Sequence, residues 1–153
     1  MQPANETNHH TVKVLNGLIE TTLDSANGYR EAAENSDAVE LRGMFSERST
    51  KREALVRRLQ AEVRTFGGEP EDDQSLLGKA HNKFVDLKNA VTGGSDKAVI
   101  DEVERGEDVI KAKYEHALRD DDLPSAARAL IEEAYASIKA DHDSVSRLKH
   151  LGL

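Results

Sequence analysis

Cysteine is absent from this 153-residue sequence, and proline and aromatic residues are scarce, with three prolines and 4% of Phe, Tyr and Trp together. Without cysteine the chain has no disulfide bond, thiolate metal site, iron–sulfur cluster or thiol nucleophile. No apolar stretch approaches the roughly 20 residues of a membrane-spanning helix, and the first eleven residues lack the hydrophobic segment of a signal peptide. We therefore expect a soluble cytoplasmic protein that does not enter a membrane.

Basic residues are outnumbered by acidic ones, 21 Lys and Arg against 29 Asp and Glu, which gives a net charge of −8. A nucleic-acid partner is not expected, because phosphate binding requires a basic face. Hydrophobic residues make up 37% and charged residues 33%, which is typical of a helical protein with a wide solvated surface and too apolar for a disordered chain. The length suits one domain with a sizeable core.

The N-terminal region divides into a leader and a helix. Residues 1–10 show no apolar periodicity, so we expect a flexible leader there and a single domain over residues 11–153. From residue 11 the apolar side chains recur at alternating steps of three and four, which predicts a helix over residues 11–35. Asp37 follows the break in this pattern and, with Glu40 three residues later, predicts the capping box of the next helix.

Four further stretches have helical periodicity, and no segment alternates like a strand. Their ranges are 37–66, 76–91, 95–119 and 124–150. Gly67-Gly68 is predicted to end the first of them, because glycine adopts the left-handed C-terminal conformation without a Cβ clash. Ser95 or Asp96 is predicted to begin the third. The fold class is therefore all-α.

The lengths of the helices and connections predict the topology. Short turns join the long helices into two antiparallel hairpins, and residues 67–94 separate the hairpins. Each long helix spans roughly 35–45 Å at about 1.5 Å per residue, and a connection of this length can cross from one end of a bundle to the other. Two hairpins joined by a long crossover that contains a short helix form a ferritin-like four-helix bundle. In the rival arrangement, residues 76–91 pack as a fifth full member.

Histidine placement tests for a ferritin-like di-metal centre. Such a centre takes one Glu from each of two helices and a Glu-x-x-His pair from each of the other two. The histidines within the predicted helices are His81, His116, His142 and His150, and none of them has Glu three residues earlier. The predicted helix over residues 37–66 has no histidine. The standard ligand set is therefore missing from the predicted helices.

Polar residues nevertheless occupy the apolar sides of the helices near their middles. They are Thr22, Arg52, Glu107 and Asp141. A guanidinium can bind two carboxylate oxygens at once, so Arg52 could pair with Glu107 in a buried network that sets the register of the helices. Two alternatives remain: a weak or altered metal site, or an error in the assumed phase of a helix.

The metal alternative has its own candidate ligands, which are Glu20, Glu104, Glu107 and His142. Carboxylate oxygens with a single imidazole suit iron or manganese. Glu20 lies one position away from the apolar side of its helix, which makes its inward reach doubtful. His9-His10 in the leader could bind a stray metal ion, but a disordered pair is expected to be inert. For His81 we expect a hydrogen bond at the end of the bundle.

Short motifs along most of the chain resemble a bacterial family of ferritin-like four-helix-bundle proteins of unknown function. They are Leu15-Asn16-x-Leu18-Ile19-Glu20, Arg52, Gly67-Gly68-Glu69-Pro70, Ser75…His81, Glu104-Arg105-Gly106-Glu107-Asp108, Tyr114…Ala117-Leu118, Leu123-Pro124 and His142-Asp143. The resemblance implies the ferritin-like fold and a bacterial cytoplasmic protein, with no established activity. Ser25 departs from the family pattern, where Gly is common, and so do Asn82 and Phe84, where Arg and Trp are usual.

Two functional hypotheses follow. In the first, the protein is a non-catalytic bundle with a buried Arg and carboxylate layer, which self-associates or binds an unidentified protein and has no cofactor. In the second, it is an iron- or manganese-binding oxidase or metal-handling protein with an altered ligand set. Leu18 and Leu23 could form the surface of a homodimer, or they could pack under the crossover.

Overall fold

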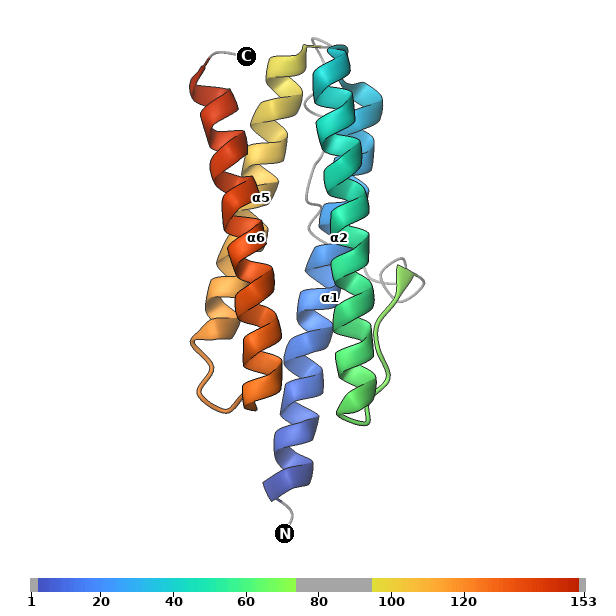
Figure 1. Cartoon of the computed structure of the whole chain (residues 1–153), viewed down its shortest axis with the longest axis vertical. Helices are drawn as coiled ribbons and strands as arrows, with labels where there is room; N and C mark the ends of the chain where they lie inside the picture. Colours follow the sequence, from blue (N-terminus) through green and yellow to red (C-terminus); the bar gives the residue numbers. More distant parts are fainter. Residues whose placement is uncertain (1–2, 74–94, 152–153) are drawn as a thin grey trace.

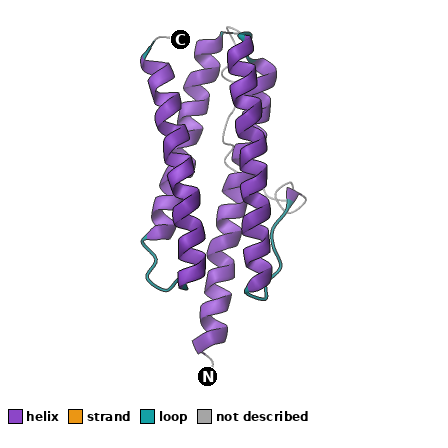
Figure 2. Ribbon diagram, viewed as in Figure 1, coloured by secondary structure: helices purple, strands orange, loops and turns teal. Residues whose placement is uncertain are grey.

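A computed structural model describes residues 3–73 and 95–151, in which four long α-helices and no strands are found (Figure 1, Figure 2). The helices are α1 (Pro3–Asn35), α2 (Val39–Thr65), α5 (Asp96–Leu118) and α6 (Ser125–His150). The predicted all-α class is confirmed.

The helices form two antiparallel hairpins, α1 with α2 and α5 with α6. Helix α1 also lies beside α5, and α2 lies beside α6. The end of α2 and the start of α5 lie at opposite ends of the bundle (Figure 1), as expected for two hairpins joined by a long crossover. The ferritin-like topology is thus confirmed. The helix expected over residues 76–91 and His81 lie outside the described residues, and so does the choice between four and five helices.

The core consists of the apolar sides of all four helices. Its fully buried members include Leu15, Ile19, Tyr29, Phe45, Leu59, Ile100, Ile110, Tyr114, Ile131 and Ile138. Removing such side chains from water is the main driving force for folding. Leu18 and Leu23 are also buried, at 4% and 7% exposed, so they do not form the exposed surface that we considered for a homodimer.

Both glycines after α2 have a structural reason. Gly67 has a φ of +82°, in the left-handed region that disfavours other residues. At Gly68, an added Cβ would lie 2.5 Å from Cγ1 of Val12, so the chain passes α1 too closely for a side chain. The predicted helix end is confirmed.

The N-terminal residues differ from the expected flexible leader, because α1 begins at Pro3. Thr11 is fully buried and donates a hydrogen bond to the carbonyl of Thr7 at 2.7 Å. Nε2 of His10 lies 2.6 Å from Oδ2 of Asp120, which belongs to the turn between α5 and α6. These polar contacts hold a helical extension that has no apolar pattern, which is why hydrophobic periodicity missed it.

The start of α2 is capped from another helix. Its N-cap is Ala38, whose side chain makes no cap, and Asp37 does not form the predicted capping box. The backbone amides of Asp37 and Ala38 instead donate to Oδ1 and Oδ2 of Asp96, at 2.7 and 3.0 Å. The carboxylate of Asp96 therefore ties the start of α2 to that of α5, which Ser95 caps through the amide of Ala98.

Replacing Asp96 by alanine tests this cap. We expect Asp96→Ala to lower the free energy of unfolding by about 1–2 kcal/mol, because the amides of Asp37 and Ala38 lose their acceptor. Asp37→Ala removes a neighbouring carboxylate that makes no cap, and it should change stability much less. Urea unfolding of the two variants measures both, and an equal loss would show that Asp96 does not act as the cap.

Candidate functional site

A guanidinium occupies the middle of the bundle. Arg52, at the midpoint of α2, is 1% exposed and makes a bidentate contact with Glu107 at the midpoint of α5. Its Nη1 and Nη2 donate to Oε1 and Oε2 of Glu107 at 2.8 and 3.0 Å, and Glu107 is fully buried. Nη2 also donates to Oδ2 of Asp141 on α6 at 3.2 Å. One cation thus joins three helices.

The fourth helix reaches the same guanidinium through Ser25, whose hydroxyl accepts from Nη1 of Arg52 at 2.6 Å. Asp141 has further cations at its other oxygen: Nζ of Lys51 lies 3.0 Å from Oδ1, and Nε of Arg48 lies 3.5 Å from it. The guanidinium carbon of Arg52 lies 5.3 Å from the ring centre of Tyr29, within cation–π range. Each carboxylate therefore has a cationic partner.

Electrostatics favours the ionised form of Arg52. Burial lowers the pKa of its guanidinium, but the surrounding groups, Glu107 above all and also Asp141, together outweigh burial, so the pKa lies above its ordinary value. Burial raises the pKa of the Tyr29 hydroxyl well above its usual range. Arg52 stays cationic and Tyr29 stays neutral throughout the physiological range.

Thr22, the fourth residue of the predicted polar network, contacts a different partner. Its hydroxyl lies 2.7 Å from the hydroxyl of Tyr114 and donates to the carbonyl of Leu18 at 2.6 Å. Burial raises the pKa of Tyr114 to about 12 although the hydrogen bond to Thr22 lowers it. The structure therefore brings Arg52, Glu107 and Asp141 into direct contact and places Thr22 in a separate pair.

Three of the four candidate metal ligands, Glu104, Glu107 and His142, have separate partners. Glu107 contacts Arg52, and Glu104 accepts from Nζ of Lys149 at 2.8 Å, which lowers the pKa of Glu104. Glu20 lines a groove between α1 and α5. The structure does not bring the four together.

His142 is bound by carboxylates on both sides. Its Nε2 lies 2.6 Å from Asp108 and its Nδ1 lies 3.1 Å from Asp143. Partial burial lowers the pKa of His142, but the hydrogen bonds to Asp143 and Asp108 together raise it more, so the pKa lies above the ordinary value of a histidine. This pairing connects α6 to α5 at the surface.

The residues in the middle of the bundle do not fit a di-metal centre. Inward-facing carboxylates would have to share two cations, whereas Glu107 and Asp141 share the guanidinium of Arg52. Glu6 and His9 have the Glu-x-x-His spacing, which we missed because we treated residues 1–10 as a leader, but both are exposed near the start of α1. They cannot serve a site in the core.

A group of side chains with suitable ligand atoms for a metal ion lies at the end of the bundle. His10, Asp120 and Asp122 place one ligand atom each within 4.8 Å of one another, and they form the one such group found among the described residues. The sequence instead predicts that His9-His10 is a disordered and inert pair. The predicted topology indicates that these residues are close together, since the start of α1 and the end of α5 meet at that end of the bundle.

No helix of the described residues is long and apolar enough to cross a lipid bilayer.

Solved structures with the same fold include two Dps proteins. A mutant of Dps1 from Mycobacterium smegmatis superposes with a TM-score of 0.81 and 10% sequence identity, over 94% of this chain and 97% of that one. The Dps protein of Vibrio cholerae O1, described as a member of a broad superfamily of ferritin-like diiron-carboxylate proteins, gives 0.74 and 13%, over 94% and 91%. Identities this low show the fold alone.

No curated protein sequence matches the chain. A family model does match, over residues 10–120, and its description is a domain of unknown function (DUF2383). This agrees with the resemblance to a ferritin-like family of unknown function that the sequence motifs carry. The chain belongs to the DUF2383 family.

Proposed function

We propose that this protein is a non-catalytic ferritin-like bundle in which an ion-paired layer of Arg52, Glu107 and Asp141 takes the place of a di-metal centre. The observation that carries the proposal is the bidentate contact between Arg52 and Glu107, both of which are at most 1% exposed. A metal ion in the middle of the bundle would have to displace a guanidinium that is already paired with both carboxylates.

Such a layer contributes specificity more than stability. A buried ion pair costs desolvation, and its clearest documented use is to fix the register of packed helices. Arg52 contacts α1, α5 and α6 at once, so a shift of α5 or α6 by one turn would separate the carboxylate of Glu107 or of Asp141 from the guanidinium. The layer therefore favours one alignment of the four helices. We propose that the bundle so aligned acts by binding a partner.

The negative net charge of the chain bears on the class of partner that it could bind. With a net charge of −8, we propose a protein partner or a second copy of the chain and no nucleic acid. From the resemblance to a bacterial family, we place the protein in the bacterial cytoplasm. The metal-handling alternative with Glu20, Glu104, Glu107 and His142 is the weaker one, because three of these residues bind Lys149, Arg52 and Asp108.

Aerobic oxidation of Fe(II) tests the non-catalytic assignment. Purified, tag-free wild type and His10→Ala, which removes the group at the end of the bundle, should oxidise Fe(II) no faster than buffer with an equal mass of an unrelated protein. If His10→Ala accelerates oxidation and Glu107→Gln abolishes the acceleration, the middle of the bundle is an oxidase site and the proposal is wrong.

A further inference from the structure

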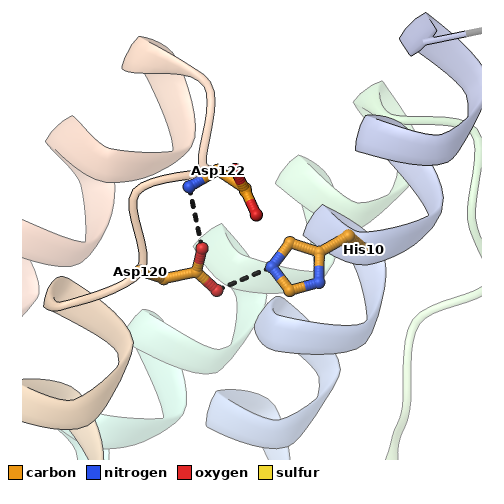
Figure 3. Close-up of side chains that lie close together, drawn as sticks. All are labelled: His10, Asp120 and Asp122. Carbon is orange, nitrogen blue, oxygen red and sulfur yellow. Dashed lines mark hydrogen bonds and ion pairs between the residues drawn. The ribbon is translucent and has the colours of Figure 1, made fainter.

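Three side chains with metal-binding atoms converge where the start of α1 meets the turn between α5 and α6. Figure 3 shows His10 of α1 directed toward Asp120 and Asp122 of that turn. Nε2 of His10 lies 2.6 Å from Oδ2 of Asp120. The group therefore combines an imidazole with two carboxylates, and both carboxylates lie at least 110 residues after the imidazole in the sequence.

The turn that carries the carboxylates is held by its own hydrogen bonds. The backbone amide of Asp122 donates to Oδ1 of Asp120 at 2.9 Å. Arg128 donates to the carbonyl of Leu118 at 2.9 Å and to that of Asp120. Asp120 is thus held in place by contacts that do not involve His10, and the hydrogen bond from the amide of Asp122 is the main reason why the pKa of Asp120 is lowered.

The site is open to a small ion. The side chain of His10 is 40% exposed and that of Asp120 is 20% exposed. Both residues also line a groove of about 740 Å³ between α1 and α5, whose wall includes Lys113 and His116. An ion can therefore reach the ligand atoms from solvent, and coordination positions not filled by the protein remain open to water.

The donor set selects a class of ion. Imidazole nitrogen suits zinc, iron and copper, whereas carboxylate oxygen suits manganese and magnesium, so a mixed set favours divalent first-row transition metals. Two ligands about 2.1 Å from a tetrahedral ion lie roughly 3.4 Å apart. His10 and Asp120 must therefore move apart by less than 1 Å, and the proton between them must leave.

We propose that His10, Asp120 and Asp122 bind a divalent first-row transition-metal ion that fastens the start of α1 to the turn between α5 and α6. This site is independent of the Arg52 layer and of the proposed function. Mg²⁺, which keeps most of its water and takes oxygen ligands, binds poorly.

Calorimetric titration of the full, tag-free chain with Zn²⁺ and Mn²⁺ at pH 7.5 tests the site. Wild type should bind one Zn²⁺ per chain, bind Mn²⁺ more weakly in accord with the usual order of affinities, and show no heat with Mg²⁺. His10→Ala and Asp122→Asn should bind Zn²⁺ at least tenfold more weakly. His9→Ala is the matched control, since His9 is the neighbouring exposed imidazole, and it should bind as wild type does.

Thermal unfolding adds a readout that does not depend on the heat of binding. Zn²⁺ should raise the Tm of wild type and His9→Ala, because an ion that binds only the folded chain stabilises it, and should leave His10→Ala unchanged. Equal affinity in wild type and His10→Ala would overturn the proposal. So would equal losses in His9→Ala and His10→Ala, which would assign binding to the histidine pair alone.

Discussion

Replacing Arg52 by alanine is expected to lower the free energy of unfolding by about 3–5 kcal/mol. Glu107 is fully buried and accepts two hydrogen bonds from Arg52, so the truncation leaves an anion in the core without its cation. The empty volume of the arginine side chain adds to the loss. Chemical denaturation of wild type and variant at pH 7.5 measures the difference.

A second arginine of α2 provides the control for Arg52→Ala. Arg58 also forms a bidentate pair: its Nη1 and Nη2 donate to Oε1 and Oε2 of Glu133 at 3.1 and 3.0 Å, but its side chain is 52% exposed. Water screens such a pair, so Arg58→Ala should cost only a small fraction of the loss in Arg52→Ala. If the two variants lose the same stability, or if Arg52→Ala unfolds at the same denaturant concentration as wild type, burial of the pair does not matter.

Removing both charges together is expected to restore most of the lost stability. Glu107→Leu alone leaves the buried guanidinium with Asp141 as its one anionic partner, and it should cost several kcal/mol, about as much as Arg52→Ala. In Arg52→Met/Glu107→Leu, apolar side chains of similar length fill the same space. Asp141 keeps Lys51 and Arg48 as cationic neighbours, so the double variant should lie within about 1–2 kcal/mol of wild type.

A double-mutant cycle over Arg52→Met, Glu107→Leu and their combination measures the coupling between the two side chains. The expected coupling is large because each single replacement leaves an unpaired charge. Additive losses would mean that the two residues do not depend on each other, and the ion-paired layer would then not exist in solution. A stable double variant would also show that the layer is retained for something other than stability.

The sequence predicts the middle of this bundle better than its ends. Arg52, Glu107 and Asp141 occupy the apolar sides of their helices, so periodicity alone places them inward, and opposite charges then meet. Thr22 follows the same rule but contacts Tyr114, while Ser25, one turn further along α1, contacts Arg52. Periodicity gives the face of a residue but not its height along the bundle axis, which depends on how the helices are aligned.

Contacts between sequence-distant polar groups account for the missed features at the ends. Asp37 has the local signature of a cap, yet Asp96 of another helix takes that role. His10 lies in a segment without an apolar pattern, and its partner Asp120 belongs to the charged turn between α5 and α6. Both partnerships follow from which helix ends meet in the folded bundle, and neither leaves a signal in a short stretch of sequence.

Fold similarity to the two Dps structures does not decide the function, since ligand sets belong to sites and not to folds. In this chain the guanidinium of Arg52 lies between Glu107 and Asp141. The proposed metal site at the end of the bundle would use other residues altogether. The two locations can therefore be separated by single substitutions.

Metal content of the His10→Ala variant tests the central claim most directly. The tag-free variant would be loaded anaerobically with Fe(II) or Mn(II), passed over a desalting column and analysed by mass spectrometry for metal per chain. We predict no metal above the level of a buffer-treated control, because Arg52 occupies the middle of the bundle. Metal retained in stoichiometric amounts by His10→Ala, and lost when Glu107→Gln is added, would contradict the account.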